Sequence, residues 1–260
     1  MPAPYLAADR THVLPLTLPI PNRGLLYLHA LVIMAQEPVL VDTGPGVLRQ
    51  EYLDAAFSVV DPGDVRWIFL SHDDRDHAGN LMTLLDLCPQ AQLVTNFQGA
   101  TRLAKEFELP MSRIRFVDNG DGFDVGDRTL VALRPPLFDS PATRGLLDTR
   151  TRLYYSVDAF AAAVPGYCEE VGDVPADVYE DGFNWLNRAN APWYAMTDPA
   201  LLEAEIDYLR RLAPEVIASY HGPVARHRSD QLCRMLGRMP RTDPIQFPSY
   251  EDLAKLMADS

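Results

Sequence analysis

Four candidate metal ligands follow one short apolar segment within six residues. Positions 67–70 have the apolar pattern of a buried strand, and residues 71–77 then read Ser-His-Asp-Asp-Arg-Asp-His. Imidazole and carboxylate groups bind Zn²⁺, Fe²⁺ and Mn²⁺, and alternate positions of an extended loop can face two different ions. The sequence therefore predicts a metal centre where this strand meets the next helix. The candidate ligands are His72, Asp74, Asp76 and His77.

Strand and helix patterns alternate through the first half of the chain. The order predicts a mixed α/β fold in which helices cover the outer faces of stacked sheets. In the second half, Asp198 and Pro199 are typical of an N-cap and a first helical position. The expected strands lie at residues 25–34, 38–41, 67–70, 92–95, 114–117, 129–133, 153–157 and 215–219. The expected helices lie at residues 47–60, 80–87, 99–107, 177–190, 199–212, 225–236 and 250–257.

The chain has 260 residues, of which 47% are hydrophobic, so it can bury a large core without disulfides or a structural metal. We therefore expect one domain over residues 1–260 and a functional role for any metal site. Cys88, Cys168 and Cys233 are widely spaced and form no CxxC pair, which is typical of free thiols in a reducing compartment. No apolar run approaches the ~20 residues of a membrane span, and the N-terminus has no leader pattern, so we expect a cytoplasmic protein.

The net charge of the chain is −13, from 23 basic and 36 acidic residues. A negative field repels phosphate backbones and anionic lipid headgroups, so nucleic acid and membrane surfaces are not expected as partners. Part of the acidic excess is expected on the surface, and part is available to neutralise bound cations.

Four segments resemble the metal-binding motifs of the metallo-β-lactamase superfamily and follow each other in that family's order. Residues 72–77 resemble HxHxDH, with Asp74 in place of the second His, and residues 40–44, Leu-Val-Asp-Thr-Gly, resemble the Asp-Thr-Gly that precedes it. Residues 156–160, Ser-Val-Asp-Ala-Phe, resemble the strand that ends in the metal-bridging Asp. Residues 219–222, Ser-Tyr-His-Gly, resemble the final His-Gly.

The resemblance implies an α/β fold of the αββα metallo-β-lactamase type, in which two mixed β-sheets lie face to face and are flanked by helices. It also implies a dinuclear metal site at one edge of this sandwich. A helical, lid-like insertion is expected at about residues 165–197 and a helical C-terminal tail at about residues 225–260. The aromatic run at residues 183–194 lies in the insertion and is expected to pack in the core or to line a pocket.

No histidine occurs between His77 and His221, although hydrolases of the superfamily carry a third histidine in this interval. Asp139 stands at the corresponding position, with 61 residues between it and His77 and 18 between it and Asp158. These intervals are similar to those of the flavodiiron proteins and the stand-alone oxygen-binding diiron proteins, which carry an acidic residue at the position of Asp74. The alternative is that Asp139 is a loop residue that braces a Pro-Pro turn and binds no metal. In that case the site could hold a single metal ion.

The resemblance to this diiron branch implies two groups of metal ligands that share the carboxylate of Asp158. Asp42 is expected to orient a ligand histidine without binding metal itself. Tyr220 is the candidate catalytic residue, since its hydroxyl could donate a proton or a hydrogen bond to an oxygen species at the metals; its plainer role is packing. One metal is expected to bind His72, Asp74 and Asp139, and the other Asp76, His77 and His221.

The charge of the implied ligand set favours iron. Four carboxylates neutralise two divalent ions, which would quench part of the acidity that a hydrolase needs for its bound water. Oxygen donors suit iron and manganese, and anionic ligands stabilise an oxidised ferric pair. Two iron ions are therefore the expected cofactor, with zinc and manganese as the alternatives.

These features predict a diiron protein that binds or reacts with dioxygen, or that oxidises a small-molecule substrate, with electrons from the substrate or from a separate donor. A flavodoxin-like domain would need roughly 150 further residues and no GxGxxG motif occurs, so no FMN or NAD site is expected in this chain. One alternative is a dizinc hydrolase of an ester, thioester or lactone, and another is an oxygen or redox sensor. Assembly into a homo-oligomer is left open.

Overall fold

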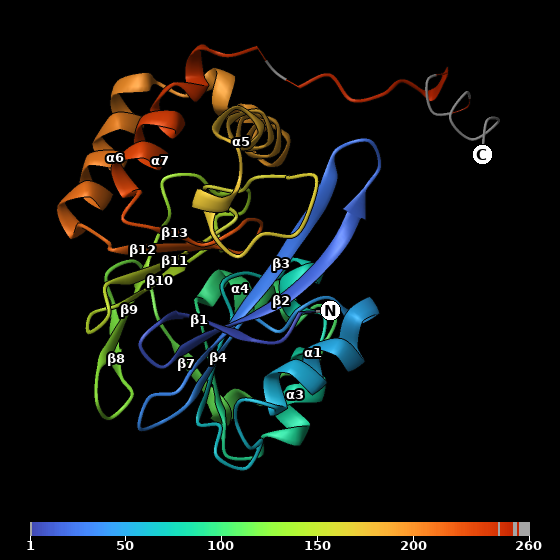
Figure 1. Ribbon diagram of the computed structural model, residues 1–260. Helices are drawn as coiled ribbons and strands as arrows, with labels where there is room; N and C mark the ends of the chain where they lie inside the picture. The colour runs from blue at the N-terminus through green and yellow to red at the C-terminus, as the bar shows by residue number, and fades with distance from the viewer. Residues whose placement is uncertain (1, 244, 252–253, 255–260) are drawn as a thin grey trace.

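The computed structural model describes residues 2–243, 245–251 and 254, and its strands form two β-sheets (Figure 1). In the first sheet the strands follow the chain order from β1 to β7. The pairs from β1 to β4 are antiparallel and those from β4 to β7 are parallel. Its strands are β1 (Tyr5–Ala8), β2 (Thr11–Ile20), β3 (Gly24–Ile33), β4 (Val39–Val41), β5 (Trp67–Phe69), β6 (Gln92–Thr95) and β7 (Ile114–Phe116).

The second sheet has the order β13-β12-β11-β10-β9-β8, and within it only β11 and β12 are parallel. The two parallel strands carry the ends from which the last two candidate ligands leave the sheet. The strands are β8 (Gly122–Asp124), β9 (Thr129–Leu133), β10 (Gly145–Asp148), β11 (Leu153–Val157), β12 (Val216–Ser219) and β13 (Ala225–Arg226).

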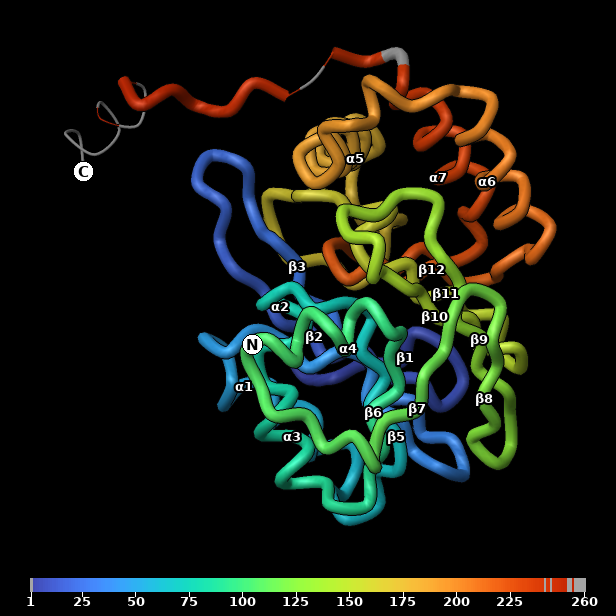
Figure 2. Tube along the Cα trace, turned by 180° about the vertical axis from the view of Figure 1, so that it is seen from behind, coloured from blue at the N-terminus to red at the C-terminus, as the bar shows by residue number. Residues whose placement is uncertain are grey.

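Helices cover the outer face of each sheet, so the molecule has four layers (Figures 1 and 2). The first sheet is covered by α1 (Arg49–Phe57), α3 (Leu81–Leu87) and α4 (Phe97–Leu103), while the short α2 (Arg75–Ala78) follows β5. The second sheet is covered by α5 (Ala176–Asn190), α6 (Pro199–Leu212) and α7 (Ser229–Gly237). Short 3₁₀ helices lie at Gly46–Leu48, Met111–Arg113, Val171–Asp173, Pro192–Met196 and Met239–Arg241.

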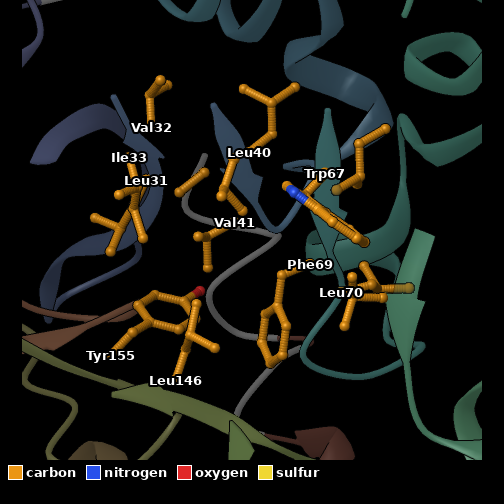
Figure 3. Close-up of a cluster of buried hydrophobic side chains, with 14 of the residues drawn as sticks. Leu31, Val32, Ile33, Leu40, Val41, Trp67, Phe69, Leu70, Leu146 and Tyr155 are labelled. Atoms are coloured by element: carbon orange, nitrogen blue, oxygen red, sulfur yellow. The ribbon is translucent and has the colours of Figure 1, made fainter. Parts of the chain in front are cut away.

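The main hydrophobic core lies between the two sheets. Figure 3 shows Leu146 and Tyr155 of the second sheet facing Val41 and Phe69 of the first, and all four side chains are at most 1% exposed. Burial of large apolar side chains contributes about 1.5–3 kcal/mol each. Two of these side chains, Phe69 and Tyr155, lie on β5 and β11, whose ends carry candidate ligands.

The expected αββα sandwich of two mixed sheets flanked by helices is confirmed. The start of the helix expected at residues 225–236 is wrong, because residues 225 and 226 pair with β12 as the edge strand β13 and helix α7 begins at Ser229. The helix expected at 47–60 is a 3₁₀ turn followed by the shorter α1. The helix expected at 250–257 lies largely outside the described residues.

Strand β2 was not expected from the sequence, and its prolines explain why. Proline lacks an N–H donor and is confined to edge strands. Strand β1 pairs with β2 only as far as Val13, so Pro15 and Pro19 lie where β2 has β3 as its one neighbour. Prolines are tolerated on this open edge even though they weaken the local strand pattern.

The N-terminus of α6 is formed as expected, since the Asp198 side chain accepts a hydrogen bond from the N–H of Ala200 at 2.8 Å.

Among the described helices, none combines the length and the apolar character needed to cross a lipid bilayer.

Candidate metal centre

The candidate ligands come from four places in the chain that meet at one edge of the sandwich. The loop after β5 and the start of α2 carry His72, Asp74, Asp76 and His77. Asp139 lies in the loop between β9 and β10, Asp158 follows the end of β11, and His221 lies two residues beyond β12. The fold therefore brings together all seven residues that the sequence indicates.

The first group of donor atoms surrounds Nε2 of His72. This atom lies 3.8 Å from Oδ2 of Asp74, 3.9 Å from Oδ1 of Asp139 and 3.6 Å from Oδ2 of Asp158. His72 is 1% exposed. The group has three carboxylates and one imidazole within a few ångströms of a common centre.

The second group surrounds Oδ1 of Asp158. This oxygen lies 3.2 Å from Nε2 of His77 and 3.2 Å from Nε2 of His221. Oδ2 of Asp76 lies 3.5 Å from each of the same two nitrogens. The two oxygens of Asp158 thus face different groups, which is the arrangement of a bridging carboxylate.

The separations of 3.2–3.5 Å in the second group fit donors around a metal ion better than donors bonded to each other. Strong N–H···O bonds are about 2.9 Å long. Two donor atoms that each lie about 2.1 Å from one ion are about 3.0–3.4 Å apart in octahedral or tetrahedral geometry. Nε2 of His77 and Oδ1 of Asp158 are buried and have no hydrogen-bond partner. Since buried polar atoms are rarely left without a partner, this pair supports a cation between them.

The other ring nitrogen of each histidine contacts the protein. Nδ1 of His77 lies 2.7 Å from Oδ2 of Asp42, and Nδ1 of His221 lies 2.8 Å from the carbonyl oxygen of Tyr27. Nδ1 of His72 lies 3.0 Å from Oγ of Ser71. A carboxylate or carbonyl can only accept, so Nδ1 carries the proton in His77 and His221 and Nε2 keeps its lone pair for a metal.

Asp42 is fully buried behind the site, where the sequence places a residue that orients a ligand histidine. Its carboxylate accepts hydrogen bonds from the N–H and the hydroxyl of Ser71, both at 2.7 Å, and from the hydroxyl of Tyr155 at 2.5 Å. Burial raises the pKa of Asp42, but its attraction to His77 and these hydrogen bonds outweigh burial and lower that pKa. Asp42 therefore stays ionised and holds the His77 ring in one orientation.

The carboxylates of the site repel each other when no cation is present. Burial and the nearby Asp158 raise the pKa of Asp139, and burial together with Asp139 raises the pKa of Asp74 to about 6, against an opposing attraction to His72. Burial also acts to raise the pKa of Asp158, but His72 and His77 outweigh it and hold that pKa well below its usual value. Two divalent cations would relieve this repulsion.

The backbone before Asp158 is in a conformation that side chains seldom adopt. Val157 has φ of +56°, in the left-handed region that is unfavourable for a β-branched residue. Its carbonyl accepts from the N–H of Tyr220 at 2.8 Å and from the hydroxyl of Ser219 at 3.1 Å. The end of β12 thus holds the turn that directs Asp158 into the site.

Asp139 lies on a loop that several side chains hold in place. Oγ1 of Thr143 is 3.4 Å from Oδ1 of Asp139, and the side-chain amide of Asn96 donates to the carbonyl of Ala142. Arg144 donates to the carbonyls of Pro141 at 3.0 Å and Thr143 at 2.7 Å. These contacts keep Asp139 within reach of the first group, and its role as a ligand stays a prediction.

Tyr220 packs against the site from behind. Its ring centroid lies 3.9 Å from that of His77, and its hydroxyl donates to the backbone carbonyl of Asp76 at 2.6 Å. The side chain is fully buried and does not line the cavity at the candidate ligands. The catalytic role expected for Tyr220 stays a prediction, and this geometry favours its alternative role in packing.

A cavity of about 230 Å³ opens at the candidate ligands. Two further residues line it, Leu26 from β3 and Asn190 from the last turn of α5. Sequence reasoning did not single out either residue, since neither belongs to a motif. Of the aromatic run at 183–194, Phe183 and Tyr194 are buried in the core between α5 and the second sheet.

The family model for the ODP family beta lactamase matches residues 27–222, and the chain belongs to this family. The matched segment includes all seven candidate ligands and the cavity residue Asn190, whereas Leu26 lies one residue before its start.

Solved structures share this fold, and curated relatives match this chain in sequence. The rubredoxin oxygen:oxidoreductase of Desulfovibrio gigas superposes with a TM-score of 0.81 at 20% identity, covering 98% of this chain and 68% of that chain. The structure titled as a peroxy diiron species of the chemotaxis sensor ODP has a TM-score of 0.67 at 18% identity, covering 93% of this chain and 99% of that chain. The anaerobic nitric oxide reductase flavorubredoxin of Salmonella typhi is 24% identical over 218 residues, which are 82% of this chain and 44% of the relative.

Proposed function

We propose that this chain is a dinuclear non-haem iron protein that binds or reacts with dioxygen in a redox role. The observation that carries this proposal is that the two carboxylate oxygens of Asp158 face different donor groups. Oδ2 faces His72, and Oδ1 faces His77 and His221. Such a shared carboxylate supports two ions side by side. The related structures named as an oxygen oxidoreductase and as a diiron sensor support iron as the metal and dioxygen as the ligand.

The proposed ligands follow from the two groups of donor atoms. Asp158 would bridge the ions, and its attraction to His72 and His77 outweighs its burial and keeps it ionised. A bound iron pair would supply redox chemistry and open positions for a small ligand. The proposed first group is His72, Asp74 and Asp139, and the second is Asp76, His77 and His221.

The residues around the ligands hold them in their binding form. Asp42 keeps a proton on Nδ1 of His77, and the carbonyl of Tyr27 does the same for His221. We propose that Tyr220 acts as a positioning residue, because its hydroxyl is bonded to the backbone carbonyl of Asp76. These contacts orient both imidazoles before a metal binds, which lowers the entropy that binding must overcome.

The donor set supports a redox role better than the hydrolase alternative. Four carboxylates neutralise the charge of two divalent ions, so a bound water would be less acidic than at a histidine-rich zinc site. Oxygen donors instead favour iron or manganese. Membership in the ODP family, whose structural neighbour is titled as a diiron sensor, agrees with this preference.

A separate protein or domain is the proposed source of electrons. This chain spans 34% of the length of a diflavin flavoprotein of Synechocystis, 44% of that of the flavorubredoxin and 48% of that of a Methanocaldococcus jannaschii relative. The names of these relatives refer to flavin and rubredoxin. We therefore propose that a flavin or iron-sulfur donor reduces the iron pair when the protein acts as an oxidoreductase.

A sensor is the second candidate function. The neighbour titled as a chemotaxis sensor shares the fold over 93% of this chain. A sensor binds its ligand without continuous turnover, whereas an oxidoreductase consumes dioxygen at a steady rate once a donor is supplied.

Metal analysis and optical spectra test the proposal. The protein should be expressed in iron-rich medium, purified without added metal and analysed for iron, zinc and manganese per chain. We expect about two iron ions and a visible spectrum that changes on anaerobic reduction and again on exposure to dioxygen. Stoichiometric zinc with a featureless spectrum would contradict the proposal. Oxygen consumption with a chemical reductant then separates an oxidoreductase from a sensor.

A further inference from the structure

The wall of the cavity at the proposed metal pair contains one polar side chain that is not a candidate ligand. Among the described residues, its lining consists of the seven candidate ligands, Leu26 and Asn190. Leu26 has no polar side-chain atom. Asn190 carries a side-chain amide with two N–H donors and one acceptor oxygen.

The amide of Asn190 has no hydrogen bond to the described part of the protein, although the residue is half-buried. Asn187, three residues earlier on α5, is fully buried and donates to the carbonyls of Ala161 and Phe183, both at 2.7 Å. The side chain of Asn187 therefore links helix α5 to the segment after Asp158. The side chain of Asn190 remains available to a bound ligand.

The position of Asn190 is fixed by close packing of α5. Gly182 lies against the backbone of Ala163, and a Cβ atom at Gly182 would come within 1.9 Å of the Ala163 carbonyl oxygen. The segment at Ala161 and Ala163 directly follows the proposed bridging Asp158. The helix is thus packed closely against the segment that follows Asp158, and Asn190 lines the cavity from the last turn of this helix.

The chemistry of the cavity limits what Asn190 can bind. A volume of about 230 Å³ is below the range of about 300–1,000 Å³ that is typical of pockets for larger organic ligands. The carboxylates and imidazoles have their donor atoms directed at the proposed ions. A small molecule or anion of two or three atoms would therefore have the amide of Asn190 as its hydrogen-bond donor and Leu26 as an apolar contact.

We propose that Asn190 is a specificity-determining residue, whose side-chain N–H donates a hydrogen bond to a small anionic or diatomic ligand at the metal pair. This inference rests on the proposed function, because it requires the two metal ions. Asn190 would favour ligands whose atom nearest to α5 carries negative charge. Leu26 adds an apolar surface that disfavours water at the same place.

Azide is a suitable probe, since it is a linear anion of three atoms that binds iron. We would titrate azide into the iron-loaded wild type and into Asn190→Leu, and follow the visible spectrum and the asymmetric stretch of the bound azide. Because a hydrogen bond to a charged acceptor is worth a factor of ten or more in affinity, we expect azide to bind roughly tenfold more weakly to Asn190→Leu and its stretch to shift. Asn190→Asp should weaken azide further, since a second negative charge would face the anion.

Asn184→Leu is the matched control, because Asn184 is half-buried on the same helix but does not line the cavity. This variant should bind azide as the wild type does. If Asn190→Leu keeps two iron ions per chain and binds azide with unchanged affinity and an unchanged stretch, the inference is wrong while the metal site stands. If the wild type holds no iron pair, the proposed function fails first, and the metal analysis shows this before any azide is added.

Discussion

The carboxylate of Asp42 lies 2.7 Å from Nδ1 of His77, although 35 positions of the chain separate the two residues. The contact joins the residue after β4 to helix α2, which follows β5, and β4 and β5 are parallel neighbours in the first sheet. The same carboxylate accepts from Ser71 and Tyr155, so both sheets contribute to it. One buried acid therefore couples the packing of the sandwich to the orientation of a candidate metal ligand.

Replacing Asp42 by Asn should weaken metal binding without removing a ligand. The amide has one acceptor oxygen in place of two, so its N–H₂ group would face Ser71 or Tyr155, which are donors themselves. Loss of such an outer partner typically costs 10–100-fold in metal affinity. Competition with a chelator measures this. Asp64→Asn, at an exposed position away from the site, is the control and should bind metal as the wild type does; equal affinity in Asp42→Asn would contradict the orienting role.

Alanine at Asp139 and at Asp158 should have different effects on metal content. Asp139 belongs to one donor group only, so Asp139→Ala should keep about one ion per chain, held by the second group. Asp158 faces both groups, so Asp158→Ala should lose both ions. Metal analysis of the purified variants checks this, with circular dichroism to show that each is folded. Two ions retained in Asp139→Ala would mean that Asp139 braces its loop and binds no metal.

The candidate ligands could be predicted because they stand in short motifs at strand ends. A strand fixes the direction in which its last residues leave the sheet, so the loop from His72 to His77, Asp158 and His221 could be placed without coordinates. Asp139 could be reached only through its spacing in the chain, since its loop carries no motif. In the structure, Arg144 anchors this loop and so keeps Asp139 close to the first group of donor atoms.

Other parts of the site could not be predicted, because tertiary packing decides them. The partner of His221 is a backbone carbonyl of Tyr27, 194 positions away, and any residue type could provide it. The direction of Asn190 depends on how α5 packs through Gly182. Strand β2 could not be predicted because Pro15 and Pro19 interrupt its strand pattern. The missing N–H groups of these prolines leave no strand hydrogen bond unmade, since β2 has no second neighbouring strand there.

Tyr220→Phe distinguishes a positioning role from a catalytic one. The variant keeps the ring against His77 but leaves the carbonyl of Asp76 without its donor, which should destabilise the protein by about 1–2 kcal/mol. If Tyr220 only positions its neighbours, two metals and the rate of the reaction with dioxygen should be retained. Denaturant unfolding and stopped-flow spectroscopy measure the two effects. A large loss of rate with unchanged stability would restore the catalytic role.

The ion pairs of Asp127 should make stability depend on pH at the end of the second sheet, away from the metal ligands. Its carboxylate accepts from Arg128 at 3.0 Å and from Arg150 at 2.7 Å. The hydrogen bond from Arg128 is the main cause that lowers the pKa of Asp127 to about 2, against a smaller effect of burial. A carboxyl group whose pKa is lower in the folded chain stabilises it above its ordinary pKa of about 4, and this contribution is lost as the pH falls toward 2.

Asp127→Asn should therefore be less stable than the wild type at pH 6, by about 1 kcal/mol, because the side chain is partly exposed and solvent screens it. The difference should shrink as the pH is lowered from 4 toward 2, where the wild-type carboxyl becomes protonated as well. Urea unfolding of the metal-free proteins at a series of pH values measures the difference directly. Asp86→Asn, at an exposed helical position, should show no such trend. A difference that stays constant down to the lowest pH at which both proteins fold would show that Asp127 acts through neutral hydrogen bonds and not through its charge.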